Sequence, residues 1–589
     1  MATTHPKVDV VTIGAGWTAA ILAAKLCPAG HDVVSIEQGS SQWTWPQFSH
    51  DHDSLRYSGR YALMVNLAKG TWTWRPRARA AALPMRQYGS FNPGKGVGGS
   101  AVHWSAQLWR YLETDFRYRS HVVERYGESK LPEGTSVQDW PITYDDLEPY
   151  YDQFEWDVGA SGKAGNIRGH IQPGGNPFEA PRDREYRHPP LEVTPFGTKF
   201  AAACESLGLH PFTQPSAIAS QAYTDPFGNH HSACLYCGFC TRFGCEVDAK
   251  ASPLNTHMPF ALATGRYEVR SDSTVLEIEV GDDGLATGVR YVDAHGGEHF
   301  QPAELVVVSA FTLENSRMLL LSRSKKHPNG IGNDRGQVGR NYTYQIYPQT
   351  LIGVWEGEKL NMYMGNTCTI KIVYDYNADV FDHSDLDFIG GMQLYSEPCE
   401  REPFNSVTPL KTADGKTWGA GWKEELRKNW DSYAGITTEG ESIAYEDNFL
   451  DLDPNYTDSF GRPLLRITFD WHENEQNMWK FIYARSVEIM KAMNPTRIVS
   501  TMPELGGYRI DKYQSTHPTG GCIMGTDPGS SVTNSYGQVW DTPNVVVTGA
   551  ALFPQNPAAN PTGTVAAVTY RAAEAIRDSY FDDPGEILG

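Results

Sequence analysis

Three features that would place a protein at a membrane or on nucleic acid are missing from this sequence. No uninterrupted apolar run is long enough to span a bilayer, and the first residues, MATTHPKVDVV, lack the basic segment and apolar stretch of a signal peptide. The net charge is −20, from 50 basic and 70 acidic residues, which argues against nucleic acid or an anionic membrane as a partner. We therefore expect no signal peptide and no membrane helix in this chain, and a cytoplasmic location if it acts alone.

Cysteine is also scarce, with nine residues in 589, and five of them are scattered at positions 27, 204, 368, 399 and 522. Scattered thiols are typical of a reduced core. The others, Cys234, Cys237, Cys240 and Cys245, fall in the twelve residues CLYCGFCTRFGC. Closely spaced thiolates hold iron–sulfur clusters, so we predict a metal–sulfur centre with these four cysteines as candidate ligands. Zinc is one alternative, although its ligands usually form two separated pairs, and disulfides or buried thiols are another.

Length and composition predict a large globular protein with more than one domain. A chain of 589 residues exceeds what one hydrophobic core normally supports. Its 56 glycines and 37 prolines are spread over many loops instead of one linker, and repeats and low-complexity segments are absent. Such a chain can bury a large cofactor, and its acidic surface can steer a basic redox partner such as a cytochrome.

The N-terminus carries the pattern of a dinucleotide-binding unit. Residues 8–13 form a near-continuous β-branched run, typical of a parallel strand buried on both faces, and GAGWTAAILAAKL follows directly. Gly14 makes the tight turn, Gly16 lets the backbone approach a pyrophosphate, and Ala19 is small enough for the helix to pack on the strand. A second strand pattern, 31–36, ends in Glu37, whose carboxylate we expect to accept from ribose hydroxyls.

A second glycine cluster, GKGVGGSAVHW from residue 94, favours FAD over NAD. Gly98 and Gly99 supply a flexible backbone that can run close beside a ring system, and His103 and Trp104 follow it. Farther along, residues 304–310 repeat the buried-strand pattern and residues 312–322 a helical one. We expect this second unit to join the same nucleotide-binding sheet.

Two loops near the C-terminus, STHPTGGC and NPTG, supply a histidine and an asparagine. His517 and Asn560 are the candidate catalytic pair. Each residue also has a structural alternative. His517 is then a histidine that caps a loop, and Asn560 is the N-cap of the helix that begins near Pro561.

These motifs together resemble the glucose-methanol-choline (GMC) flavoprotein oxidoreductases, and within that family the large subunits of gluconate 2-dehydrogenase complexes. The resemblance covers residues 7–155, 230–345 and 455–580, and is carried by GAGWTAAILAAKL, LPMRQYGSFNPGKGVGGSAVHWSAQLWR, DWPITYDDLEPYYD, CLYCGFCTRFGCEVDAKAS, STHPTGGCIMGTDP and NPAANPTGTVAAVTYRAA. It implies an α/β fold with a doubly wound, Rossmann-like FAD-binding domain (1–345 and 511–589, cysteine segment 230–250) and a substrate-binding domain with an antiparallel sheet (mainly 346–510).

The resemblance also implies roles for the candidate residues. His517 would take the proton from a secondary alcohol while hydride passes to flavin N5, and Asn560 would hydrogen-bond the same oxygen. His103 is either bonded covalently to the flavin or packed at its edge. The cysteine segment resembles one that holds a 3Fe–4S cluster, for which Cys234, Cys240 and Cys245 match best and Cys237 least. The expected FAD-binding residues are Gly14, Gly16, Ala19, Glu37, Gly98, Gly99, His103 and Trp104.

The implied function is the oxidation of gluconate to 2-ketogluconate, or of a related sugar or sugar acid, with electrons passing through the cluster to a multihaem cytochrome c subunit. A small subunit would assist export to the periplasmic side of the inner membrane, and only partners would hold the chain at the membrane. Two alternatives stay open. One is an oxidase or glycoside 3-oxidoreductase of the same family that uses oxygen or a soluble acceptor. The other is a redox-sensing or scaffold protein with zinc and an idle site.

Overall fold

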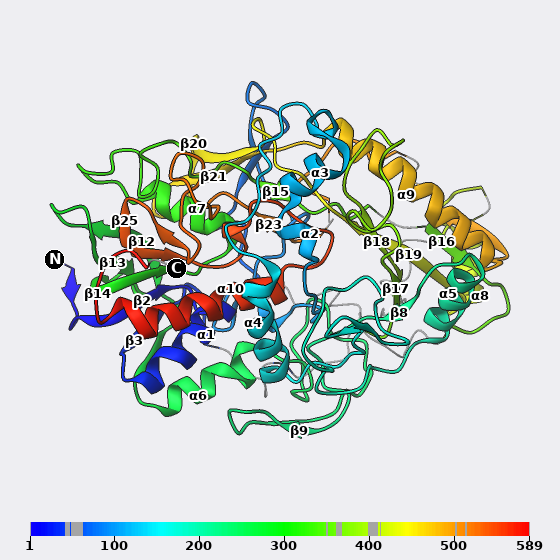
Figure 1. Ribbon diagram of the computed structural model, residues 1–589, viewed down its shortest axis with the longest axis horizontal. Coiled ribbons are helices and arrows are strands. Elements are labelled where there is room, and N and C mark those ends of the chain that lie inside the picture. Colours follow the sequence, from blue (N-terminus) through cyan, green and yellow to red (C-terminus); the bar gives the residue numbers. More distant parts are fainter. Residues whose placement is uncertain are drawn as a thin grey trace.

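Two large sheets form the framework of the molecule. In the view of Figure 1, the sheet that contains the N-terminal strands lies toward the left, and the sheet of β16 to β19 lies toward the right. The computed structural model describes residues 2–41, 48, 63–348, 351–360, 368–397, 410–412, 414–500, 504–512 and 515–587.

The first sheet is organised by one long strand, β14, which pairs differently along its two halves. The second half pairs in parallel with β2 and β25, and the first half pairs antiparallel with β13. The order along the main path is β11-β3-β2-β14-β13-β12, with β1 and β25 on β14 and β24 on β25. The strands are β1 (Thr3–Thr4), β2 (Val8–Ile13), β3 (Val33–Ile36), β11 (Tyr267–Arg270), β12 (Thr274–Val280), β13 (Ala286–Val292), β14 (Glu298–Val308), β24 (Gln538–Val539) and β25 (Thr542–Val547).

The parallel part of this sheet is covered on both faces, which explains its sequence. The valines of 306–308 and 545–547 are completely buried, as expected for strands that lie between helices and core. Helix α1 (Trp17–Leu26) is buried on nearly every side and packs against α10 and α6. The predicted strand at 8–13, the glycine turn and the helix after it are confirmed. The predicted strand at 304–310 is the end of β14, and α7 follows it.

The second sheet is antiparallel, in the order β22-β16-β19-β18-β17-β8. Five of its strands come from the region predicted to form the main part of the substrate-binding domain, and the edge strand β8 comes from an earlier segment, residues 212–213. Strand β8 belongs to this sheet because it pairs with β17, and no pattern in the neighbouring residues predicts that pairing. The strands are β8 (Phe212–Thr213), β16 (Leu351–Val354), β17 (Lys371–Val373), β18 (Met392–Glu397), β19 (Tyr433–Gly440) and β22 (Arg497–Ser500).

Smaller sheets join segments that are distant in the sequence. A four-stranded sheet has the order β20-β21-β4-β5, in which β21 pairs with β4 from the N-terminal part of the chain. A separate two-stranded ladder pairs β15 with β23. The strands are β4 (Thr73–Arg75), β5 (Leu83–Pro84), β20 (Phe449–Thr457), β21 (Pro463–Thr468), β15 (Thr343–Tyr344) and β23 (Pro518–Thr519), with the hairpins β6–β7 (Asn166–Ile167, His170–Ile171) and β9–β10 (Tyr223–Thr224, His230–His231).

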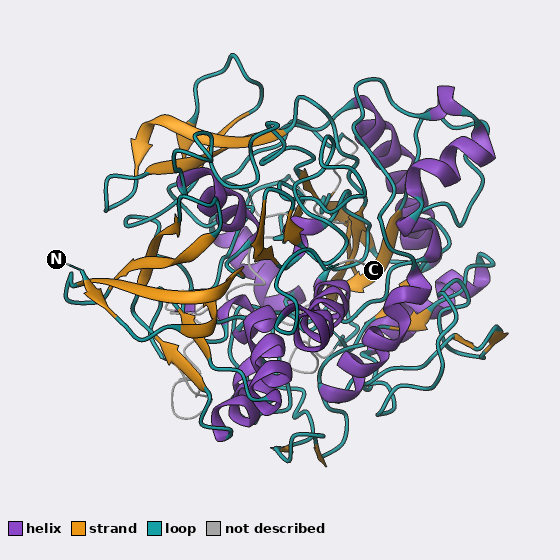
Figure 2. Ribbon diagram, turned by 60° about the vertical axis from the view of Figure 1, so that its left-hand side comes forward, coloured by secondary structure: helices purple, strands orange, loops and turns teal. Residues whose placement is uncertain are grey.

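Much of the chain runs in loops between these sheets, as Figure 2 shows. None of the helices in the described part of the chain combines the length and the apolar character needed to cross a membrane. Helices α5 and α9 pack on the antiparallel sheet, and α10 packs between α1 and α4. The remaining helices are α2 (Glu113–Phe116), α3 (Tyr118–Tyr126), α4 (Tyr144–Asp157), α5 (Pro195–Ser206), α6 (His257–Ala263), α7 (Thr312–Leu321), α8 (Ala420–Asn429), α9 (Glu473–Ala492) and α10 (Thr562–Ala575).

Candidate active site

A cavity of about 670 Å³ opens where the parallel strands end. Ile13, Ser309 and Thr548, the last residue of β2 and the residues just after β14 and β25, all line it. Open α/β sheets bind ligands beyond the carboxyl ends of their strands. The position of the cavity therefore agrees with the nucleotide-binding site that the sequence predicts.

The first glycine segment forms one wall of this cavity. Gly14 has φ +102°, and a Cβ there would lie 2.8 Å from the Ser309 carbonyl oxygen, so only glycine fits. At Gly16 a Cβ would meet nothing within 4 Å, because this residue faces open space at the start of α1. No side chain caps that helix, so its first N–H groups are available to a phosphate. Ala19 is fully buried and lies outside the cavity lining, as a helix-packing residue should.

Glu37 has a task that the sequence analysis missed. Its Oε1 accepts from the backbone N–H of Gly39 (2.8 Å) and Gly96 (3.2 Å), and its Oε2 accepts from Ala15 (3.2 Å). Burial raises the pKa of the carboxyl, and the three hydrogen bonds oppose that rise. Glu37 also lines the cavity, so its contact with a ribose stays a prediction. Its observed role is to join the two glycine segments. The one sequence signal for that role is that glycines stand in both segments, where the backbones can approach each other closely.

The second glycine segment lies against the first. The N–H of Gly98 donates to the Ala15 carbonyl (2.7 Å), and a Cβ on Gly99 would lie 3.4 Å from the Cα of Gly16. Both glycines have positive φ and both line the cavity, as does Trp104. The backbone can approach a bound ring here because no side chain intervenes.

His103 is placed differently from its neighbours. The ring is buried and is not among the cavity-lining residues, although Ala101 and Trp104 are. Burial, together with the charges of Lys250 and Arg242, lowers the pKa of His103 to about 3. Its Nε2 is buried and has no hydrogen-bond partner among the described residues, so both the covalent and the non-covalent role of His103 stay predictions.

His517 is held by the β15–β23 ladder, which brings Gln345 beside it. Tyr344 pairs with Pro518, and the imidazole Nδ1 of His517 donates to Gln345 Oε1 (2.5 Å). The Gln345 amide cannot turn round, because its Nε2 donates to the carbonyls of Pro557 (3.2 Å) and Ala558 (2.6 Å). The proton of the neutral ring is therefore on Nδ1, and Nε2 carries the lone pair.

The loop before His517 is strained. Thr516 has φ +88°, a conformation that a β-branched residue rarely adopts. Thr516, His517 and Pro518 all line the cavity. Burial lowers the pKa of His517 to about 4, so the ring is neutral near pH 7. The loop thus presents a neutral base to the cavity, and the loop-capping alternative does not account for the Gln345 contact.

Asn560 lies beside His517, as the sequence predicts. Its Nδ2 donates to Nε2 of His517 (3.3 Å), and its Oδ1 is buried and has no hydrogen-bond partner among the described residues. The alternative role as a helix N-cap is wrong, because Pro561 occupies the N-cap of α10 and no side chain caps that helix. Asn560 is buried just behind the cavity wall, whose lining includes its neighbours Pro561 and Thr562.

Glu439, at the end of β19, was missed by the sequence analysis. Gln393 Nε2 donates to its Oε2 (2.7 Å), and Tyr395 and Asn560 also hydrogen-bond the carboxyl. Burial raises the pKa of Glu439 to about 8, so this side chain is neutral near pH 7. An acid inside a strand of otherwise uncharged residues, YAGITTEG, was the one available signal. Gln345 offered none, because it lies 172 positions from His517.

Of the four clustered cysteines, Cys240 is buried, Cys234 and Cys245 are half-buried and Cys237 is exposed; Cys399 lies outside the described residues. In the described part of the chain, no three of these sulfur atoms lie within 4.8 Å of one another. A tetrahedral zinc with Zn–S bonds of about 2.3 Å needs sulfur atoms about 3.8 Å apart, so the side chains do not form a ready zinc site. Which metal the segment holds stays a prediction.

Lys250 fastens the cysteine segment to the cavity wall. Its buried Nζ donates to the carbonyls of Trp104 (2.8 Å), Cys240 (2.8 Å) and Phe243 (2.7 Å). The N–H of Arg242 donates to the carbonyl of His103 (2.7 Å). Because Trp104 lines the cavity and Cys237 is exposed, the segment extends from the cavity wall to the surface.

Comparison with known proteins agrees with this site. Two family models, both described as GMC oxidoreductase, match residues 136–346 and 444–569. The gluconate 2-dehydrogenase flavoprotein of Pantoea cypripedii is 39% identical over 591 residues, which cover 99% of this chain and 95% of that protein. The chain belongs to the GMC oxidoreductase family. The cradle of glycines and the uncapped start of α1 fit FAD, and the protein is an FAD-dependent oxidoreductase that acts on alcohols.

Other relatives of this GMC oxidoreductase share its full length. The 2-methyl-1,2-propanediol dehydrogenase of Mycolicibacterium austroafricanum is 28% identical and covers 99% of this chain and 97% of its own. The fructose dehydrogenase large subunit of Gluconobacter japonicus is 26% identical, with 96% and 97% covered. Among solved structures, pyridoxine 4-oxidase from Mesorbium loti has a TM-score of 0.60 at 15% identity, over 96% of this chain and 99% of that one, which shows a shared fold.

Replacing Gln345 tests whether it sets the His517 tautomer. In Gln345→Leu the ring loses the acceptor for its Nδ1 proton, so the tautomer with the proton on Nε2 becomes accessible and the base is blocked. We expect the rate of flavin reduction by substrate to fall about 10- to 100-fold, the range typical of losing a group that orients a histidine. Stopped-flow reduction measures the rate. An unchanged rate at equal FAD content would contradict the assignment.

The pH dependence follows from the two shifted pKa values. Because burial lowers the pKa of His517 to about 4, kcat/KM should be constant between about pH 5 and 7. A histidine of ordinary pKa would lose about thirtyfold at pH 5. Above about pH 8, Glu439 ionises and draws the Asn560 N–H toward itself, so kcat/KM should decline. In Glu439→Gln, which cannot ionise, that decline should vanish while the acid side of the profile stays unchanged.

Proposed function

We propose that this chain is the flavoprotein of a dehydrogenase that oxidises a secondary alcohol of a sugar acid, with gluconate to 2-ketogluconate as the specific reaction. The observation that carries the proposal is the neutral His517 ring, whose tautomer is set by Gln345 and whose Nε2 lies beside Asn560 at the cavity. The name of the relative that is 39% identical supports the choice of substrate.

The residues divide the chemistry between them. When bound, FAD would accept the hydride that leaves the carbinol carbon of the substrate. His517 Nε2 accepts the hydroxyl proton of the substrate, and the product is a ketone. The imidazolium formed in this way keeps its Nδ1–H bond to Gln345 Oε1, so the ring does not turn away during the reaction. Gln345 thus acts as a positioning residue.

Asn560 and Glu439 shape the place of the substrate oxygen. The Asn560 N–H now held by Nε2 can move to the substrate oxygen, which would stabilise the negative charge that develops there. Its unpartnered Oδ1 can accept from a neighbouring hydroxyl. Glu439 is neutral near pH 7, so it does not repel the carboxylate of a sugar acid. A charged acid at this position would oppose an anionic substrate.

For the outgoing electrons, we propose an iron–sulfur cluster on the cysteine segment, with Cys234, Cys240 and Cys245 as ligands and 3Fe–4S as its type. Burial lowers the pKa of Lys250, and thiolate charge on Cys240 and Cys245 would oppose that fall. A multihaem cytochrome c subunit would receive the electrons at the surface near Cys237. A small subunit would assist export to the periplasmic side of the inner membrane. The relative that is named a large subunit supports the existence of partners.

Anaerobic reduction of the purified protein tests the function. Gluconate should bleach the flavin absorbance, and His517→Ala should retain FAD but slow this reduction by about 10²- to 10⁴-fold. His170→Ala, which changes an exposed histidine, is the matched control and should behave like the unchanged protein. Reduction by other sugars but not by gluconate would overturn the substrate. Peroxide formation in air at the full turnover rate would favour the oxidase alternative.

A separate experiment tests the cluster. Elemental analysis should find iron and sulfide, and electron paramagnetic resonance should show a signal that is lost in Cys240→Ala. That variant should still be reduced by gluconate but should no longer pass electrons to cytochrome c. Cys204→Ala, which removes a buried thiol elsewhere, should keep the iron. Absence of iron from freshly isolated protein, with normal cytochrome reduction, would contradict the proposal.

A further inference from the structure

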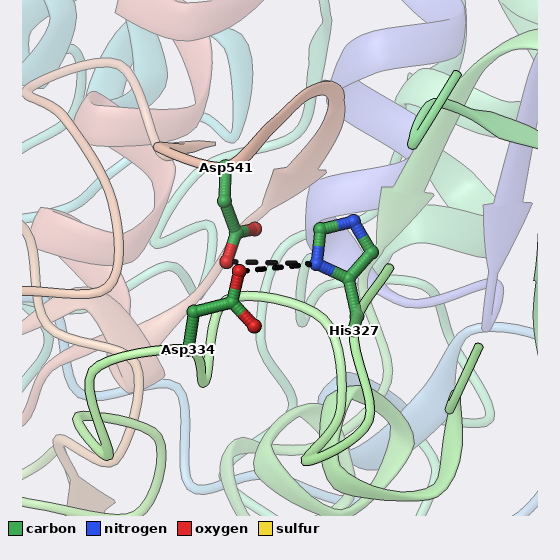
Figure 3. Close-up of side chains that lie close together, drawn as sticks. All are labelled: His327, Asp334 and Asp541. Atoms are coloured by element: carbon green, nitrogen blue, oxygen red, sulfur yellow. Dashed lines mark ion pairs between the residues drawn. The ribbon is translucent and has the colours of Figure 1, made fainter. Parts of the chain in front are cut away.

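A second group of titratable side chains lies at the opposite end of the parallel sheet from the cofactor cavity. His327 follows α7, Asp334 lies in the next turn of the chain, and Asp541 precedes β25. Figure 3 shows the imidazole and both carboxylates turned toward one another. None of the three lines the cofactor cavity, from which the length of β25, about 20 Å, separates them.

The buried ring of His327 presents its Nδ1 to the two acids. The side chain is only 5% exposed, and Nδ1 is buried without a hydrogen-bond partner among the described residues. Its nearest acidic oxygens are Asp334 Oδ2 at 3.5 Å and Asp541 Oδ2 at 3.8 Å. If Nδ1 carried a proton, neither oxygen would accept it at a good hydrogen-bond distance.

The other ring nitrogen indicates which tautomer the neutral ring adopts. His327 Nε2 donates to the carbonyl of Gly284 at 3.1 Å, so the lone pair is on Nδ1 and faces two carboxylate oxygens. The donation of one ring N–H to a backbone carbonyl is the usual support of a metal-binding histidine. Asp541 is supported in the same way, because its Oδ1 accepts from the N–H of Gly332 (3.0 Å) and its Oδ2 is left for the centre.

We propose that His327, Asp334 and Asp541 bind one divalent first-row cation such as Zn²⁺ or Mn²⁺. All three ligand atoms lie within 4.8 Å of one another. Tetrahedral metal bonds of about 2.0–2.1 Å put neighbouring ligands about 3.4 Å apart, a few tenths of an ångström less than the separations from Nδ1. An imidazole with two carboxylates suits these cations, and two negative charges balance the 2+ charge. Asp334 is 42% exposed, which leaves room for water at the remaining positions.

The site would join segments that are far apart in the sequence. Asp541 belongs to the β24–β25 connection, His327 and Asp334 to the loop after α7, and Gly284, which holds the ring, to the turn between β12 and β13. A cation that binds only the folded state stabilises it by RT ln(1 + c/Kd), where c is the free cation concentration, so the stabilisation grows with that concentration. We therefore expect it to raise the melting temperature without changing the rate of flavin reduction.

Titration of the FAD-loaded protein with Mn²⁺ tests the proposal. After treatment with a chelator and removal of that chelator, the protein should bind Mn²⁺ at this site. Loss of the six-line resonance of free Mn²⁺ at room temperature reports the binding. Mn²⁺ is chosen because it has little preference for the thiolates of the cysteine segment. Asp541→Asn and Asp334→Asn should each weaken the binding at least tenfold.

Two controls make the result decisive. Asp282→Asn changes an acid in the turn near Gly284 that is outside the group, and should leave the affinity unchanged. Asp334→Asn alters an exposed side chain, so it should fold even if Asp541→Asn does not. No binding up to millimolar Mn²⁺ would overturn the proposal. Equal affinity in the unchanged protein and in Asp334→Asn would overturn it too, since the bound cation would then lie elsewhere.

Discussion

The buried carboxylate of Glu37 joins the two glycine segments, and the cofactor cavity depends on their contact. Burying a carboxylate is costly unless hydrogen bonds replace its water. Here the N–H groups of Ala15, Gly39 and Gly96 supply them, one from each of three loops. The glycines can approach so closely because they have no Cβ; at Gly39 a Cβ would lie 2.2 Å from the nitrogen of Gly96. The wall of the cavity is therefore backbone, which suits a cofactor with phosphates and a flat ring.

A second chain of polar contacts orients the candidate catalytic residues. It runs from the carbonyls of Pro557 and Ala558 through Gln345 to His517, and from His517 to Asn560. The direction of each hydrogen bond is fixed, because the Gln345 amide nitrogen donates to two carbonyls and its oxygen must therefore accept from His517. The β15–β23 ladder places the first half of this chain, and the start of α10 places the second. The His517 ring is thus oriented by the protein alone, without a bound substrate.

Features of the fold and the site could be predicted from the sequence when the residues that determine them are close together along the chain. The strand at 8–13, the turn at Gly14 and the following helix are written in neighbouring residues, so their pattern predicted them. The pairing of His517 with Asn560 was also expected, because both residues stand in short polar loop motifs and the resemblance gave them related roles. Gln345 and Glu439 were not expected, since their importance comes only from contacts across the two sheets. The edge strand β8 joins the second sheet through a contact of the same kind, its pairing with the distant strand β17.

The sequence by itself determined the kind of chemistry: two glycine segments for a dinucleotide, a histidine for a proton, and four thiols in one short segment. These features depend only on residue types and on short spacings along the chain, so they can be recognised without knowing the fold. Only the tertiary structure decided which nitrogen of His517 carries the lone pair, that Glu37 joins loops, and that the His103 ring is buried. Hydrogen-bond direction and burial depend on atoms contributed by remote segments, and these meet only when the sheets are assembled.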